Sequence, residues 1–142
     1  MADRPSWLRE IEHTGDTGVE VEAPTRAELF ARAALAMARL MVEEEGIEPV
    51  ERREVAARGV EDAALLHDLL AGALNLFLSD GFIWRDAAAT EDGERVVLTL
   101  TGERFDRRRH TLLGEIKAVT YHQLSVAKSD TEGWRARVIF DV

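Results

Sequence analysis

Two aspartates stand where their carboxylates could bind a metal ion. Asp16 lies in a glycine-flanked turn after an expected strand, and Asp141 directly precedes Val142. The α-carboxylate of Val142 would lie near the Asp141 side chain, so with Asp16 the cluster would supply only oxygen ligands. Such a set suits a hard cation such as Ca²⁺ or Mg²⁺ and is poor for zinc. Three close carboxylates also repel one another unless a cation or an arginine neutralises them.

Composition and spacing alone favour a different interpretation, in which the same two aspartates bind no metal. Asp16 would be a turn residue whose side chain binds nearby backbone. Asp141 would pair with Arg135 or Arg137, which share its phase along the expected last strand.

The other residues that could do chemistry are histidines and a basic segment. The four histidines are dispersed, and only His13 and His122 lie in suggestive contexts. The sequence has no nucleophile elbow, phosphate-binding glycine loop or zinc-protease motif, so we expect no catalytic residue. A dense basic patch could contact RNA phosphates or an acidic partner, although a solvated loop is the simpler interpretation. It consists of Arg104, Arg107, Arg108 and Arg109.

Composition limits the class of protein. The chain has 142 residues, of which 27 are acidic and 18 basic, and its formal net charge is −9. This balance argues against a protein that holds nucleic acid by phosphate neutralisation alone, and it fits a basic partner. With 46% hydrophobic residues the chain can bury a substantial core. The absence of cysteine excludes disulfides, thiolate catalysis, zinc fingers and iron–sulfur clusters.

No targeting or membrane segment is evident, so we expect a cytoplasmic protein without a membrane partner. Residues 1–10 are polar and lack the apolar run of a secretory signal. The longest apolar stretch, residues 63–78, is interrupted by His67, Asp68 and Gly72. We therefore expect this stretch to be too short and too polar to span a bilayer.

Hydrophobic periodicity predicts the first elements. Residues 19–23 alternate apolar and charged side chains, the pattern of a half-buried strand, with residues 7–13 as its hairpin partner. Thr25, followed three residues later by Glu28, forms a capping box that begins a helix. Residues 46–49 contain the glycine and proline that close this segment.

The rest of the chain is mostly strand-like around a second helix. That helix begins at residue 61 or 62 and ends at residues 80–81, with a leucine-rich buried face, and Asp92-Gly93 is a hairpin turn. Because helices and strands do not alternate regularly, we predict an α+β fold. It is a single domain over residues 1–142, a mainly antiparallel sheet with two principal helices packed on it. The later predicted strands cover residues 50–59, 82–89, 94–102, 115–129 and 134–142.

Three motifs, in matching order, resemble the archease family. Residues 12–16, Glu-His-Thr-Gly-Asp, are similar to the family's opening Glu-His-Thr-Ala-Asp. Residues 117–122, Lys-Ala-Val-Thr-Tyr-His, resemble its most recognisable signature. Residues 138–142, Val-Ile-Phe-Asp-Val, resemble its hydrophobic-Phe-Asp-hydrophobic end. Gly102, Glu103, Asp106, His110 and the leucine-rich second helix also fit.

The resemblance implies a function that composition does not. Archeases are protein cofactors of the RtcB-type tRNA-splicing RNA ligase. They promote guanylylation of the ligase's catalytic histidine, allow multiple turnover and can broaden its nucleotide use, but they are not themselves ligases. The expected partner is therefore an RtcB-type ligase, with tRNA reached indirectly through it.

The resemblance also implies a divalent-cation site. Its ligands map to Asp16, Asp141 and Val142, with Ca²⁺ expected first and Mg²⁺ or Mn²⁺ as alternatives. His13, Lys117 and His122 are expected to support the ligands or to face the partner. Gly15 replaces the family's usual alanine, Thr17 an aliphatic residue and Leu69 a frequent tryptophan, but no proposed ligand is missing.

Two alternatives belong to other classes. The carboxylate cluster could serve a small metal-dependent hydrolase of nucleotides or phosphates, because a bound cation can activate water. Against it, no general base or phosphate-cradling loop is evident. A metal-independent chaperone or RNA-modification accessory module would instead use the apolar and acidic surface. Partner binding that is insensitive to chelator would favour that third alternative.

Overall fold

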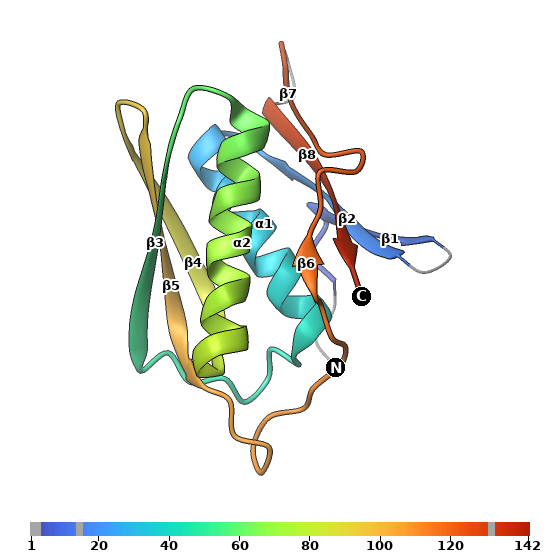
Figure 1. Cartoon of the computed structure of the whole chain (residues 1–142), viewed down its shortest axis with the longest axis vertical. Coiled ribbons are helices and arrows are strands. Elements are labelled where there is room, and N and C mark those ends of the chain that lie inside the picture. The colour runs from blue at the N-terminus through green and yellow to red at the C-terminus, as the bar shows by residue number, and fades with distance from the viewer. Residues whose placement is uncertain (1–3, 14–15, 131–132) are drawn as a thin grey trace.

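The computed structural model describes residues 4–13, 16–130 and 133–142, which form two helices and eight strands (Figure 1). The helices are α1 (Arg26–Met41) and α2 (Asp62–Asp80). The strands are β1 (Leu8–His13), β2 (Asp16–Ala23), β3 (Glu51–Arg58), β4 (Phe82–Asp92), β5 (Arg95–Arg104), β6 (Ala118–Val119), β7 (Ser125–Ser129) and β8 (Gly133–Asp141).

The strands form two antiparallel sheets rather than the single sheet that was predicted. One has the order β1-β2-β8-β6, with β7 also pairing with β8, and the other has the order β3-β5-β4. The helices lie between the sheets, and each contacts strands of both (Figure 1). The α+β class with two helices is thus confirmed. Strand periodicity shows that one face is buried, but it does not show which strands share a sheet.

The predicted cap of α1 is confirmed. The Thr25 hydroxyl accepts a hydrogen bond from the Glu28 backbone N–H at 3.1 Å. This bond satisfies one of the N–H groups that the first turn leaves unpaired. The alanine-rich inner face of α1, with Phe30 and Met37 fully buried, packs against β2 and β4.

Helix α2 is the leucine-rich element of the core. By its length and its mean hydropathy of 1.2, this helix could span a membrane. The prediction that the segment is too short and too polar to span a bilayer is therefore wrong. Its leucines nevertheless have partners within the protein, since Leu65, Leu66, Leu69 and Leu70 are at most 1% exposed. Their burial between the two sheets is the physical reason for this apolar composition.

Two details of the predicted strands are corrected. The hairpin between β4 and β5 pairs Asp92 with Arg95, so its turn residues are Gly93 and Glu94, one position later than predicted. Gly93 has a φ of 62°, which glycine adopts without steric cost. The predicted extended run over residues 115–129 instead contains β6, a turn and β7.

Candidate functional site

The two aspartates singled out in the sequence lie directly opposite each other on neighbouring strands. Asp16 begins β2 and Asp141 ends β8, and the antiparallel register pairs them. Directly opposite residues on adjacent strands project from the same face with Cβ atoms about 5 Å apart. Asp16 is half-buried and Asp141 is exposed. Like charges in this arrangement are destabilising, so the pair is suited to a shared cation.

The alternative pairing of Asp141 with arginines is not what the structure shows. Arg137 donates to Glu20 at 3.0 Å and Arg135 to Glu22 at 2.7 Å, their cross-strand partners on β2. Along a strand, residues four and six positions from Asp141 lie about 13 and 20 Å away. Among the residues that the structure describes, neither Asp16 nor Asp141 forms an ion pair with a basic side chain.

The chain's end lies beside this pair. Val142 directly follows Asp141 and is 41% exposed. Among the described residues, no three histidine, aspartate or glutamate side chains form a metal-binding group, and the predicted ligand set consists of two side chains and the α-carboxylate of Val142. This donor set of carboxylate oxygens fits Ca²⁺ or Mg²⁺.

Backbone pairing joins the segment 117–122 to the strand that carries Asp141. The Lys117 N–H donates to the Asp141 carbonyl at 2.7 Å, and Ala118 is the register partner of Asp141. Lys117 is exposed. His13 pairs with Asp16 in the β1–β2 register, although its side chain lies outside what the structure describes. The structure therefore brings Lys117 and His13 beside the two aspartates along the backbone.

His122 lies farther from the aspartates, in the turn after β6. Thr120 holds this turn, because its hydroxyl donates to the Ile139 carbonyl at 2.8 Å and accepts from the His122 N–H at 3.2 Å. Gln123, in the left-handed region with φ of 54°, completes the reversal. The exposed His122 side chain is thus presented to solvent rather than to Asp141.

A histidine on α2 contacts this motif, and no pattern in the sequence indicates this contact. The His67 ring stacks on Tyr121, and its Nε2 lies 3.2 Å from the Val119 carbonyl oxygen. These residues are more than fifty positions apart, so only the fold brings them together. His67 anchors the segment 117–122 to α2.

The basic loop after β5 is built on a buried carboxylate. Glu103 accepts hydrogen bonds from the Arg109 guanidinium, at 2.5 and 3.2 Å, from the Glu48 N–H at 2.7 Å and from His110 Nε2 at 2.9 Å. These contacts lower the pKa of Glu103 to about 2. The hydrogen bonds from Arg109 contribute most, those from the Glu48 N–H and His110 act in the same direction, and burial of the carboxylate opposes them. His110 Nδ1 accepts from the Asp106 N–H at 2.9 Å, so His110 is the neutral tautomer with its proton on Nε2.

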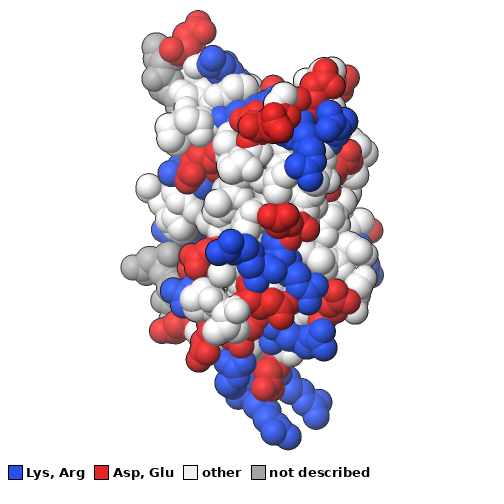
Figure 2. All heavy atoms as spheres, turned by 90° about the vertical axis from the view of Figure 1, so that its left-hand side faces the viewer, with Lys and Arg blue, Asp and Glu red and all other residues white. Residues whose placement is uncertain are grey.

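This network divides the predicted basic patch. Arg109 is bound to Glu103, which raises the pKa of its guanidinium, so this arginine is less available to RNA or a partner than the other three. Arg104, Arg107 and Arg108 are exposed. Figure 2 shows basic side chains projecting at the lower end of the molecule, the end where the loop after β5 lies in Figure 1.

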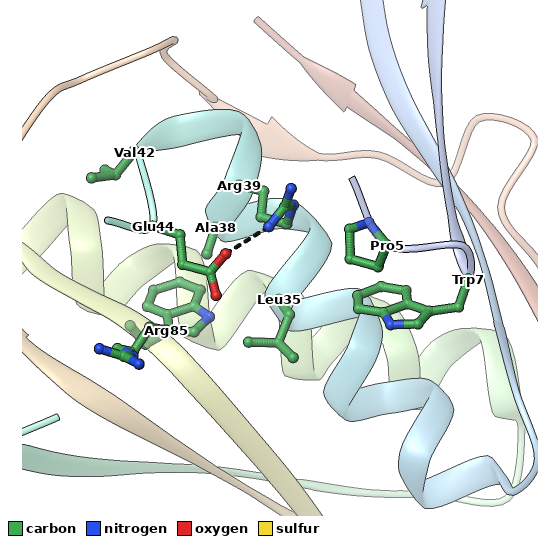
Figure 3. A pocket seen from close by; sticks show the side chains of 9 residues that line it. Pro5, Trp7, Leu35, Ala38, Arg39, Val42, Glu44 and Arg85 are labelled. Carbon is green, nitrogen blue, oxygen red and sulfur yellow. Dashed lines mark hydrogen bonds and ion pairs between the residues drawn. The ribbon is translucent and has the colours of Figure 1, made fainter. Parts of the chain in front are cut away.

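An apolar pocket lies elsewhere, between the N-terminal arm, the end of α1 and β4 (Figure 3). Trp7, Leu35 and Trp84 line it, and the Arg39–Glu44 ion pair, at 2.7 Å, borders it. Its volume of about 180 Å³ is below the range of about 300–1,000 Å³ that is usual for drug-sized ligands. None of the predicted site residues lines it, so the predicted site is not this cavity.

Comparisons with known proteins agree with the motifs over nearly the whole chain. The model of the Archease protein family matches residues 8–142. A protein archease of Methanosarcina barkeri is 34% identical over 147 residues, covering 100% of both chains, and one of Methanopyrus kandleri is 35% identical over 137 residues, covering 94% of this chain and 97% of its own.

A solved structure has the same fold. The solution structure of Methanobacterium thermoautotrophicum protein 1598 superposes with a TM-score of 0.81 at 26% identity, covering 96% of this chain and 99% of the other. Sequence, family model and fold agree, and the chain therefore belongs to the archease family.

Proposed function

We propose that this protein activates an RtcB-type RNA ligase by promoting guanylylation of the ligase and its multiple turnover. The observation that carries the proposal is the register pairing of Asp16 with Asp141. It places two carboxylates on one face, at the end of the sheet to which the segment 117–122 is also paired. Family membership supports the choice of partner.

The two aspartates and the terminal carboxylate of Val142 would hold a divalent cation, Ca²⁺ first and Mg²⁺ or Mn²⁺ as alternatives. When bound, the cation supplies positive charge that neutralises the carboxylates and attracts nucleotide phosphates. In its absence, Asp16 and Asp141 repel each other across the strands. The protein's own contribution is to hold these oxygens at one fixed place on a sheet.

Lys117 supplies a second positive charge beside the pair. Its backbone is fixed by the bond to Asp141, and its exposed side chain is available to a phosphate or to the ligase. His13 would support Asp16, its register partner, and His122 would face the partner from the turn that Thr120 holds. The ligase would carry the tRNA, and both proteins would act in the cytoplasm.

A guanylylation assay with purified RtcB-type ligase tests the proposal. The variants Asp16→Asn and Asp141→Asn remove the paired charges, and Asp86→Asn is the matched control. Asp86 is exposed on the other sheet, and its only ion pair in the described chain is a loose one to Arg85 at 3.9 Å. We expect the first two variants to lose at least tenfold in stimulation and the control to retain it.

Two outcomes would contradict the proposal. One is full activation by folded Asp16→Asn and Asp141→Asn proteins, which would contradict the role of the carboxylate pair but not the activation of the ligase. The other is nucleotide turnover by the isolated protein, which would support the metal-dependent hydrolase instead.

A further inference from the structure

The loop after β5 carries three arginines that differ from most of the others in this chain. We call Arg104, Arg107 and Arg108 the basic tip; all three are exposed, and in the described ranges none has an ion-pair partner. Many arginines elsewhere are bound to carboxylates at 4.0 Å or less. These include Arg9, Arg26, Arg32, Arg39, Arg53, Arg109, Arg135 and Arg137.

The base of the tip is rigid. Glu103 and His110 are 8% and 4% exposed, and their hydrogen bonds close the loop on itself. Asp106 adds further constraints, since its side chain accepts from the Arg108 N–H at 2.9 Å and its carbonyl accepts from the Arg109 and His110 N–H groups. A loop that is ordered before binding loses less conformational entropy when a ligand binds.

The two acidic residues of the loop form no ion pair with the tip. Glu103 binds Arg109 and His110. The Asp106 carboxylate lies 3.8 Å from Arg109 and accepts a hydrogen bond from the Arg108 backbone N–H. Three guanidiniums without an ion pair in the described residues therefore lie within five positions of one another, on a protein whose net charge is −9. A bound anion would provide the opposite charge that these groups lack.

The chemistry of the tip favours RNA phosphate over an acidic protein surface. A guanidinium fork matches the oxygens of a carboxylate as well as those of a phosphate, so the surroundings of the tip decide between the two. Protein interfaces have an apolar centre. The loop of residues 103–110 exposes no large apolar side chain, and Val50 is the one exposed large hydrophobic residue among those that line the shallow depression beside Arg104 and Arg107. Phe105, its one aromatic residue, is half-buried beside His110, so the loop offers no exposed ring on which a base could stack.

We propose that Arg104, Arg107 and Arg108 bind backbone phosphates of the RNA held by the ligase, without reading its sequence. This inference rests on the proposed function. Three contacts on an acidic protein give weak binding, but docking on the ligase would raise the effective concentration of the tip near the RNA. The tip would then add affinity only within the ternary assembly.

The test compares two triple variants of equal charge. Arg104→Gln/Arg107→Gln/Arg108→Gln removes the tip. Its control, made at exposed arginines of β3 and β5 that also lack ion pairs within the described residues, is Arg52→Gln/Arg58→Gln/Arg95→Gln. Binding of fluorescent single-stranded RNA to the ligase–protein complex is measured over a range of salt concentrations.

The expected result is a change in the salt dependence. Each phosphate contact contributes about 0.7 to the slope of log K against log salt, so losing three reduces its magnitude by about 2. The control triple variant leaves the slope unchanged. Replacing the three tip residues by lysine preserves the slope, because charge rather than the fork determines counterion release.

Two results would overturn the inference. One is an unchanged slope for the folded glutamine tip variant. The other is weaker docking of that variant to the ligase without RNA, which would assign the tip to an acidic protein surface. In both cases guanylylation by the wild-type protein can remain intact, and the proposed function then stands. A wild-type protein that fails to stimulate guanylylation would overturn both.

Discussion

His67 on α2 stacks on Tyr121, with ring centroids 4.0 Å apart and an interplanar angle of 16°. The same imidazole contacts the Val119 carbonyl, so one side chain connects the core helix to the segment beside Asp141. The ladder between this segment and β8 contains only Ala118 and Val119, with hydrogen bonds of Lys117 and Thr120 on either side. Such short pairing makes a side-chain anchor important for its position.

His67→Ala should destabilise this attachment. We expect a loss of about 1–2 kcal/mol in the free energy of unfolding, measured with urea, because the substitution removes the ring stack and the contacts of the imidazole nitrogens with Asp68 and the Val119 carbonyl. Tyr121→Phe preserves the ring and should be nearly neutral. His122→Ala, an exposed neighbour, is the matched control. An equal loss for His67→Ala and His122→Ala would show that the stack contributes nothing.

Calcium should reverse the sign of the effect that Asp141→Asn has on the free energy of unfolding. In chelator, Asp141→Asn should raise the free energy of unfolding by about 0.2–1 kcal/mol, because it removes repulsion from Asp16. At a hundredfold excess of Ca²⁺ over its Kd, binding should stabilise the wild-type protein by about 2.7 kcal/mol. The variant should lose this gain.

Thermal unfolding with and without calcium checks this prediction, with Asp86→Asn as the control. That control should respond to calcium like the wild-type protein. Equal stabilisation of wild type and Asp141→Asn by calcium would exclude Asp141 as a ligand.

Glu103 should make stability depend on acid pH. Its pKa, about 2 when folded, lies below the ordinary value of 4.5, so the unfolded chain binds the proton more readily. The stabilisation is therefore fully present above about pH 4.5 and is lost as pH falls toward 2. Glu103→Gln lacks this dependence on pH. Its loss in free energy of unfolding relative to the wild-type protein should therefore be larger near neutral pH than near pH 3.

Urea denaturation across this range measures the difference. Glu54→Gln is the control, because Glu54 is exposed on β3 and has no ion pair in the described part of the chain. A deficit of Glu103→Gln that is constant from neutral to acid pH would contradict the assigned pKa.

Local patterns predicted those elements whose causes are local. Thr25 caps α1 through a residue three positions away, and the alternation in residues 19–23 gives β2. The extended run predicted over residues 115–129 failed because Thr120 and Gln123 reverse the chain there. Thr120 acts through its hydrogen bond to β8, and Gln123 acts through its left-handed backbone conformation. Hydrophobic periodicity indicates neither of these.

The site was predicted in part, for a related reason. Asp16 and Asp141 could be proposed from ligand chemistry and from family resemblance, but their opposition comes from the β2–β8 register. Arg109 shares the residue type and segment of the basic tip, and only the fold shows that the buried Glu103 binds it. Sequence proximity therefore identified the basic loop without separating its structural arginine from its available ones.

The α-carboxylate of Val142 is the third ligand expected beside Asp16 and Asp141. If the α-carboxylate of Val142 is a ligand, adding two glycines after it moves that carboxylate by about 7 Å. Calcium affinity depends on the number of charged ligands, so we expect the extension to weaken binding by about tenfold or more. Val142→Ala keeps the carboxylate in place and should bind calcium like the wild-type protein. Calorimetric titration distinguishes the two, and an unchanged Kd for the extended protein would exclude the α-carboxylate of Val142 as a ligand.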